Sequence, residues 1–251
     1  MIISPRSSLL SGSCLPSHLT AHFQQLRCCE QSVNCIEEIR HGCYYFSYME
    51  SIYGKYNDIL PEVMESIVDP IRRFNDQTKK DTGNTVYEHL IYRVKSDPSM
   101  RDKCRRKSLP ETTKSALCDI HDALGIRIVT GYVDDIYTIV KFLKSLPSCK
   151  VIDEKDYIRN SKPNGYRSYH MILQLSVPFE DFQGNNPGRY FAEFQLRTIA
   201  MDSWASLEHE LNYKQKVGNE KMIVSELKRV ADELASCDIS MQTIRDLIRQ
   251  G

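Results

Sequence analysis

The sequence predicts an α+β protein in which a mixed β-sheet is flanked by helices and a long helix ends the chain. Three observations predict this fold class. Several short segments alternate apolar and polar residues, which is the period of a half-buried strand. Other segments repeat apolar residues at steps of three or four, which is the period of an amphipathic helix. The last segment, 219–250, keeps the helical period throughout its length.

Length and charge narrow the class of protein. A chain of 251 residues can bury one substantial core, which favours a single domain with helical additions. Lys and Arg together number 33, as do Asp and Glu, so the net charge is zero and a globally basic, DNA-binding protein is not indicated. No apolar run reaches the length of a membrane span, and the opening segment is interrupted before a signal peptide could form. We therefore expect a cytoplasmic protein without membrane contact.

The cysteines indicate a reducing compartment. There are nine of them, none forms a CxxC pair, and Cys28 is adjacent to Cys29. Neither a zinc site nor a secreted disulfide framework matches this spacing. We expect reduced thiols.

The first part of the chain is the least informative. Residues 1–43 are rich in Ser and Cys with weak periodicity, which predicts a loosely ordered leader or a poorly packed helical extension. From Tyr44 to Lys80 the apolar residues recur with helical spacing, and Pro61 and Pro70 leave open whether this is one helix or two. We expect three parts: an N-terminal extension at 1–43, a catalytic domain at 44–218, and a packing or oligomerisation helix at 219–251.

A strand over 86–95 is followed by a helix with a cationic face. Ser96 or Asp97 is the expected N-cap and Pro98 the first helical residue. Lys95 precedes the cap, and one face of the helix carries Ser99, Lys103 and Arg106. A helix N-terminus beside a row of cations suits a polyphosphate, whereas ordinary solvated charge is the alternative interpretation.

The next strand contains Leu124, Ile126 and Ile128 at alternate positions and leads into a helix through Tyr137 and Leu143. Asp122 enters this strand and Arg127 lies within it. Strict alternation would place these two side chains on opposite faces. A bulge, or an offset start of the strand near Gly125, is therefore needed if both serve one site.

Two further strands surround a glycine-containing turn. A strand at 150–158 precedes the turn Pro163–Asn164–Gly165, and Tyr166 follows in the loop. In the strand after it, His170 lies on the polar side, opposite the apolar side made by Tyr169, Met171, Leu173 and Leu175.

The segment 189–197 is the best-defined strand. Its apolar side consists of Tyr190, Ala192, Phe194 and Leu196, and its polar side carries Glu193, Gln195 and Arg197. The helix after it has an apolar stripe that we expect in the core, made of Ala200, Trp204, Leu207 and Leu211. A second stripe, with Asp202 and His209, faces either solvent or the site.

Two strand carboxylates, Asp122 and Glu193, together with the cationic helix, suit a Mg²⁺ ion that bridges phosphates. Neither a GxxxxGK[ST] loop nor a GxGxxG fingerprint occurs in the chain. The residues therefore favour a nucleotidyltransferase-like site.

Five ordered motifs resemble a known family: RVKSDPSMRDKCRRKS, DALGIRIV, NGYRSYH, EFQLRT and WASLEHELNYK. In this order and spacing they resemble the synthetase domain of the RelA/SpoT alarmone enzymes, and most of all the small single-domain alarmone synthetases. The resemblance runs from about Tyr53 to the C-terminal helix and leaves the leader unmatched. It implies the alarmone synthetase fold and transfer of pyrophosphate from ATP to the 3′-hydroxyl of GTP or GDP, which yields pppGpp or ppGpp and AMP.

The resemblance also implies a role for each matched residue. The adenine would lie between Arg93 and Arg127. The ATP phosphates would be held by Lys95, Ser99, Lys103 and Arg106. Mg²⁺ would be bound by Asp122 and Glu193, with Glu193 as the base for the 3′-hydroxyl. The acceptor nucleotide would be bound by Lys162, Tyr166, His170, Gln195 and His209, with Tyr166 stacked on guanine.

Further implications are a homotetramer, a role in the stringent response and no hydrolase activity. One departure from the family is Asp202, which stands where Asn is common near the guanine edge, so its negative charge is expected to weaken or alter purine selection. Two alternatives remain: a toxin-like relative that pyrophosphorylates the 3′ end of tRNA, and a catalytically inactive nucleotide-binding regulator. RNA is otherwise expected only as a regulator.

Overall fold

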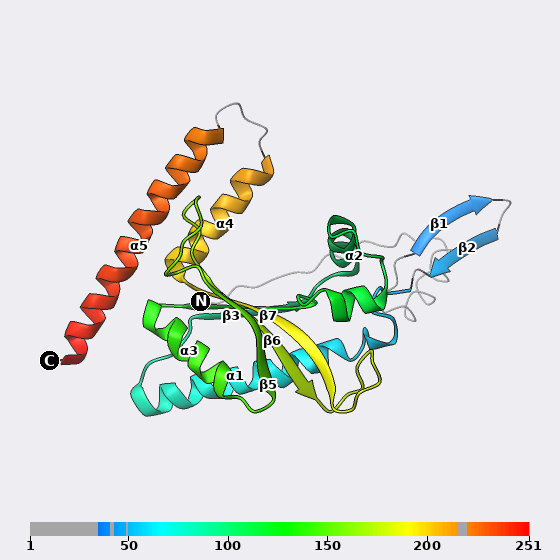
Figure 1. Cartoon of the computed structure of the whole chain (residues 1–251), viewed down its shortest axis with the longest axis horizontal. Coiled ribbons are helices and arrows are strands. Elements are labelled where there is room, and N and C mark those ends of the chain that lie inside the picture. The colour runs from blue at the N-terminus through cyan, green and yellow to red at the C-terminus, as the bar shows by residue number, and fades with distance from the viewer. Residues whose placement is uncertain (1–34, 41–42, 49, 215–219, 251) are drawn as a thin grey trace, which may run out of the picture. The chain divides into compact units, whose positions relative to one another are not determined.

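The computed structural model describes residues 35–40, 43–48, 50–214 and 220–250 (Figure 1). The chain divides into two compact units, Met1–Glu50 and Ser51–Gly251. In the first unit, β1 (Cys35–Arg40) pairs antiparallel with β2 (Cys43–Tyr48). The helical pattern expected from Tyr44 is therefore wrong at these residues, because the aromatic run CYYFSY suits a strand. The rest of the expected leader, 1–34 and 41–42, lies outside the described residues.

The second unit is built on a five-stranded sheet. Its strands are β3 (His89–Val94), β4 (Leu124–Thr130), β5 (Cys149–Asp156), β6 (Tyr169–Val177) and β7 (Gly188–Thr198). They lie in the order β3-β4-β7-β6-β5. Only β4 and β7 pair in parallel, and the other pairs are antiparallel. The sheet is therefore mixed, which confirms the predicted fold class. Its strand order places β7 at the centre.

Five α-helices accompany the sheet in the described part of this unit: α1 (Leu60–Thr82), α2 (Asp97–Arg106), α3 (Val133–Ser145), α4 (Ile199–Lys214) and α5 (Glu220–Gln250). A short 3-10 helix, Gly54–Tyr56, and a π-helical turn, Ser115–Asp119, complete the helical elements of this part. The first is a single helix that has Pro61 in its first turn and continues through Pro70, so the question of one helix or two is settled in favour of one. Ser96 is the N-cap of α2, and Pro98 lies in its first turn.

The core lies between one face of the sheet and the two helices α1 and α3, which run along that face (Figure 1). Phe194, Ala192 and Leu196 of β7 are completely buried, as their alternation predicts. Leu60 and Val63 of α1 and Leu143 of α3 are buried in the same cluster. The opposite face of the sheet is consequently free to carry the polar side chains of the strands.

A second, smaller core joins α4 to α5. Its buried members are Trp204, Ala205 and Ala231. The apolar stripe expected on α4 is correct for Trp204 but wrong for Leu207 and Leu211, which are 60% and 54% exposed. The reason is that α4 extends away from the sheet after its first turns, so its later residues have no sheet to cover (Figure 1).

Within the described residues, no helix is both long and apolar enough to cross a bilayer. The cysteines whose side chains are described, Cys104, Cys118, Cys149 and Cys237, are free thiols.

Candidate active site

The register of the sheet brings polar side chains of three strands into adjacent rows. Gly125 of β4 lies between Arg93 of β3 and Glu193 of β7. In the next row, Arg127 pairs with Gln195. A side chain at Gly125 would project into open space, since the nearest atom to a Cβ built there is the Arg93 carbonyl oxygen, 3.9 Å away. Because residue 125 is a glycine, no side chain fills the space between those of Arg93 and Glu193 on this face of the sheet.

A cavity of about 350 Å³ lies over these rows, which is the size of a typical small-ligand site. It brings together six residues that the sequence had singled out: Arg93, Lys95, Asp122, Arg127, Glu193 and Gln195. Its remaining lining residues are Ile91, Tyr92, Gly125 and Ile126.

Asp122 and Arg127 share this cavity because β4 starts late. The strand begins at Leu124, so Asp122 lies before it and does not follow its alternation. The Lys95 amide donates to the Ala123 carbonyl oxygen at 2.8 Å, which fixes the entry of the strand. Of the two arrangements considered from sequence, the offset start is the one the structure has, and the β3–β4 and β4–β7 registers run without a shift.

The Asp122 carboxylate is the most enclosed charge of the cavity, with 11% of its side chain exposed. Its Oδ2 accepts hydrogen bonds from the ammonium groups of Lys95 and Lys103. Burial by itself would raise the pKa of Asp122, but the hydrogen bonds and charges of the two lysines outweigh it and lower that pKa. Among the described residues, Oδ1 is buried without a hydrogen-bond partner.

Lys95 is held from both sides. Its carbonyl oxygen accepts a hydrogen bond of 2.7 Å from the buried hydroxyl of Tyr53, and its ammonium group pairs with Asp122. Burial lowers the pKa of Lys95, and the carboxylate compensates only part of that effect. Lys95 thus remains a half-buried cation beside a carboxylate at the wall of the cavity.

Glu193 lies beside His170, with 3.8 Å between Oε1 and Nδ1. The interaction with His170 lowers the pKa of Glu193, against the opposing effects of burial and of the Asp122 charge. Gln195 donates to Oε2 at 3.4 Å. Glu193 is therefore ionised at neutral pH and available as a proton acceptor.

A hydrogen-bonded chain continues from His170 to Arg197. His170 Nε2 and the Tyr166 hydroxyl are 2.7 Å apart, and Arg197 Nη2 donates to the same hydroxyl at 2.8 Å. A guanidinium group can only donate, so the hydroxyl accepts from Arg197. The direction of its hydrogen bond with Nε2 depends on the tautomer of the ring. The other ring nitrogen, Nδ1, faces Glu193.

Asp202 lies between two guanidinium groups. Its Oδ1 is 2.9 Å from Arg197 Nη1 and 3.4 Å from Arg127 Nη1. The negative charge of Asp202 is thus compensated inside the protein, and its effect on purine selection stays a prediction. Asp202 also connects Arg127, which the resemblance assigns to ATP, to Arg197, which contacts Tyr166.

Lys162 lies at the edge of this network. Its ammonium group is 4.7 Å from the centre of the Tyr166 ring and 4.8 Å from that of Tyr157. Both contacts are within the range of cation–π interactions. The loop that carries Lys162 and Tyr166 therefore presents a cation and two aromatic rings together.

Seven of the residues named from sequence are not among those that line the cavity in the described part of the chain. Lys103, Lys162, Tyr166 and His170 belong to the contacts described above, whereas Ser99, Arg106 and His209 do not. Ser99 is exposed, and its hydroxyl interacts with Ser96. Arg106 is exposed and pairs with Asp102 at 2.9 Å. His209 is exposed on α4.

Sequence reasoning named no role for Arg197 or Tyr157, which contact Tyr166 and His170. For Arg197 a signal existed, since it falls on the polar side of β7 with Glu193 and Gln195. For Tyr157 there was none, because its contacts depend on how the strand ends meet.

The donor set fits a hard divalent cation. Asp122 and Glu193 line the same cavity, and a buried Asp122 oxygen has no hydrogen-bond partner among the described residues. No cluster of three or more His, Cys, Asp or Glu suited to a metal occurs in the described ranges. Mg²⁺ is usually held by one or two protein carboxylates, with substrate phosphates and water as the other ligands.

Comparisons with known proteins agree with this geometry. Residues 92–218, about half of the chain, match a family model described as the region found in RelA / SpoT proteins. The chain is 40% identical over 163 residues to the GTP pyrophosphokinase YwaC of Bacillus subtilis, covering 65% of this chain and 76% of that protein. It is 34% identical over 171 residues to the GTP pyrophosphokinase YjbM of the same organism, covering 68% of this chain and 78% of that protein.

Solved structures show the same fold. The crystal structure of small alarmone synthetase 1 from Bacillus subtilis, bound to its product pppGpp, superposes with a TM-score of 0.65 at 30% identity. The match covers 77% of this chain and 95% of that one. Small alarmone synthetase 2 of the same organism gives a TM-score of 0.62 at 34% identity, over 76% of this chain and 98% of that one. By sequence, by family match and by fold, the chain belongs to the RelA/SpoT family.

Proposed function

We propose that this protein is a GTP pyrophosphokinase, which transfers pyrophosphate from ATP to the 3′-hydroxyl of GTP or GDP and so makes the alarmones pppGpp or ppGpp of the stringent response. The observation that carries the proposal is the cavity in which the carboxylates of Asp122 and Glu193 meet the cationic side chain of Lys95. Relatives named GTP pyrophosphokinases and a related structure bound to pppGpp support it.

ATP would occupy the half of the site formed by β3, β4 and α2. Arg93 and Arg127, which lie diagonally on adjacent strands, would enclose the adenine. The phosphates would be held by Lys95, Ser99, Lys103 and Arg106. The related structure of small alarmone synthetase 1 bound to AMPCPP supports an ATP-like ligand for this fold. Phosphate oxygens would replace the Asp122 carboxylate as partners of Lys95 and Lys103, since charge-assisted hydrogen bonds to phosphate are strong.

Mg²⁺ would be held by Asp122 and Glu193, because release of the two lysines frees the first carboxylate while the second already faces the cavity. When bound, such an ion neutralises charge on the phosphates of the substrate. This role agrees with the preference of Mg²⁺ for carboxylate oxygens.

The guanine nucleotide would bind beside it, at Lys162, Tyr166, His170, Gln195 and His209. Glu193 accepts the proton of the 3′-hydroxyl while the bond from that oxygen to the β-phosphorus forms. The bond between the β-phosphorus and the oxygen of the α-phosphate breaks, and AMP leaves with the electron pair. A lowered pKa keeps Glu193 ionised at neutral pH, although it makes the carboxylate a weaker base.

Alignment of the two bound nucleotides would account for much of the remaining rate enhancement. Correct placement of reacting groups contributes on the order of 7–11 kcal/mol in well-oriented intramolecular reactions. In this protein the orientation rests on the Glu193–His170–Tyr166–Arg197 chain.

The test is incubation of the purified protein with labelled ATP and Mg²⁺ in the presence of GTP, GDP, GMP or bulk tRNA, in separate reactions, followed by separation of the products. We expect the label on GTP and GDP. Label found only on tRNA would replace this proposal with the toxin-like activity. Absence of transfer to any acceptor would favour an inactive regulator.

Four further features belong to the proposal. We expect no hydrolase activity, so release of pyrophosphate from pppGpp in the presence of Mn²⁺ would contradict it. A homotetramer is supported by the exposed apolar residues Met241, Ile244 and Ile248 on α5, and a monomer in size-exclusion chromatography with light scattering would contradict it. The proposed location is the cytoplasm, where ATP and GTP are available. Within the chain, 44–218 would form the synthetase domain between the extension 1–43 and the helical part 219–251.

A further inference from the structure

The loop that carries Tyr166 rests directly on helix α5. Gly165 has a left-handed φ of +92°, and a Cβ built there would lie 2.5 Å from Ala231 Cβ and 3.1 Å from Lys228 Cα. The first separation is too short for real Cβ atoms, and the second is tighter than most of their contacts. The backbone of the loop is therefore in direct contact with the helix, and the contact leaves no room for a side chain at Gly165.

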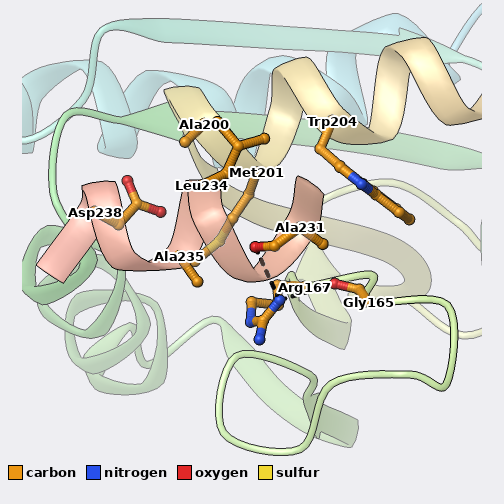
Figure 2. Close-up of a pocket in the computed structure, with 9 residues that line it drawn as sticks. All are labelled: Gly165, Arg167, Ala200, Met201, Trp204, Ala231, Leu234, Ala235 and Asp238. Carbon is orange, nitrogen blue, oxygen red and sulfur yellow. Dashed lines mark hydrogen bonds between the residues drawn. The ribbon is translucent and has the colours of Figure 1, made fainter. Parts of the chain in front are cut away.

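Arg167 ties the same loop to the same helix. Its Nη1 donates to the Ala231 carbonyl oxygen at 3.2 Å and to the Gly165 carbonyl oxygen at 3.1 Å. Its Nη2 donates to Asp232 Oδ1 at 2.9 Å. Figure 2 shows Gly165 and Arg167 against Ala231, with the bond from Arg167 drawn as a dashed line. A single guanidinium group thus bridges the turn and two consecutive residues of α5.

The aromatic ring of the loop is supported by the small core between α4 and α5. The Tyr166 and Trp204 rings are 6.2 Å apart, and the Trp204 indole N–H donates to the Leu227 carbonyl oxygen of α5 at 2.9 Å. The free space left where the loop, α4 and α5 meet is about 10 Å³ (Figure 2), which is roughly the room of one water molecule. The contact is close-packed, so a shift of α5 must displace the loop.

These contacts all concern the acceptor half of the proposed site. The described contacts of α5 go to this loop, to Trp204, to Thr198 at the end of β7, to Tyr132 and to the start of α3. The residues proposed for ATP lie elsewhere, on β3, at Lys95 after it, on α2 and on β4. An effect transmitted through the direct contacts of α5 should therefore be felt by one nucleotide and not by the other.

We propose that α5 positions the acceptor loop and that Arg167 is the positioning residue, so that the seating of α5 sets the affinity for the guanine nucleotide and leaves ATP binding unchanged. This inference rests on the proposed function, since it takes the ligand of Tyr166 to be GTP or GDP. Arg167 acts through the loop and has no part in the chemistry.

The experiment measures binding directly, so that it does not depend on turnover. The dissociation constants for GDP and for AMPCPP are determined for the wild-type protein, Arg167→Ala, Arg167→Lys and Asp232→Ala. The matched control is Arg229→Ala, which removes an exposed arginine of α5 that pairs only within the helix, with Glu226 and Glu233, in the contacts described. Thermal unfolding of each variant shows whether it is folded.

For Arg167→Ala we expect the GDP dissociation constant to rise by about tenfold or more, as for loss of a charge-assisted hydrogen bond. Arg167→Lys and Asp232→Ala should give smaller increases in the same direction. The dissociation constant for AMPCPP should stay within about twofold of the wild-type value in every variant, a change well below the tenfold increase expected for GDP. The control should match wild type for both ligands.

If Arg167→Ala does not fold, the lysine variant and Asp232→Ala decide the matter by the same comparison. Equal losses for GDP and AMPCPP would show a general structural role and overturn the inference. Unchanged GDP binding in folded variants would overturn it as well, while leaving the proposed function intact. A wild-type protein that binds no guanine nucleotide would overturn both.

Discussion

Replacing Gly165 with alanine tests the contact between the acceptor loop and α5 most directly. The added methyl group would meet Ala231 Cβ at 2.5 Å, and the residue would have to keep a φ of +92°. Neither neighbour can rotate away, because Ala231 has no side-chain torsion and the second contact, at 3.1 Å, is to the backbone of Lys228. We expect the acceptor loop to move away from α5.

The free-energy cost of Gly165→Ala has two parts. An L residue in left-handed geometry costs roughly 1–2 kcal/mol. Overpacking of a close-packed contact adds about 1–3 kcal/mol. The second part is specific to the seat on α5, and it corresponds to an increase of about 5- to 150-fold in the KM for GTP if it falls wholly on acceptor binding.

Gly184→Ala separates these two parts. Gly184 has a φ of +79°, yet a Cβ there would meet no atom within 4 Å. This control therefore carries the backbone strain without the steric contact. Steady-state kinetics with GTP varied at saturating ATP, and then with ATP varied at saturating GTP, give the KM values of both variants.

We expect Gly165→Ala to raise the KM for GTP and to leave the KM for ATP near its wild-type value, with Gly184→Ala unaffected in both. Adding Ala231→Gly to Gly165→Ala removes the 2.5 Å contact and should restore part of the loss, as a double-mutant cycle would reveal. The same KM for GTP in Gly165→Ala and Gly184→Ala would refute the reasoning.

The other predictions concern chemistry and stability. Glu193→Gln should lower turnover by on the order of 10²–10⁴-fold while leaving the dissociation constant for AMPCPP nearly unchanged, and wild-type turnover in this variant would remove the base assignment. Removal of divalent cations with EDTA should abolish turnover, with recovery on adding Mg²⁺; activity that persists in EDTA would contradict the metal site. Phe194→Ala should lower the unfolding free energy by about 3–5 kcal/mol in denaturant titrations, because the ring is fully buried, and a loss no larger than that of the exposed Phe182→Ala would contradict this placement. Burial raises the pKa of Asp238 in the folded state despite the hydrogen bond from Thr198, so its contribution to stability is complete below the unfolded pKa of about 3.9 and is lost as pH rises through the folded value. Asp238→Asn should therefore gain stability relative to wild type as the pH rises from the unfolded pKa of about 3.9 through the folded value in urea unfolding, and a difference that stays constant from below that unfolded pKa up to neutral pH would argue against the raised pKa.

Most strands and their faces were predictable from sequence. The alternation in 189–197 placed Phe194 inside and Glu193 outside, and both lie there. Such a pattern is a local property of an extended backbone, in which successive side chains point to opposite faces whatever the sheet packs against. The ordered motifs likewise indicated the family, since they record short stretches of chain.

Errors arose where local pattern does not decide the outcome. Leu207 and Leu211 have helical spacing with Trp204 but are exposed, because their burial depends on whether another element reaches them. The helical periodicity of 59–74 predicts a helix that starts too early, at Tyr44, because the aromatic segment of β2 pairs with β1 instead. Pairing with another strand is not encoded in one segment alone.

The fold class, the strand faces and most of the site residues that meet in the cavity follow from local sequence patterns and motifs. The partners of these residues do not, because they depend on the packing of distant elements. Asp122 is held by lysines 27 and 19 positions before it. Arg167 reaches a helix residue 65 positions away. Periodicity and motifs are properties of neighbouring residues, whereas the partner of a charged side chain depends on which distant elements pack together, and that is settled only when the whole chain has buried its core.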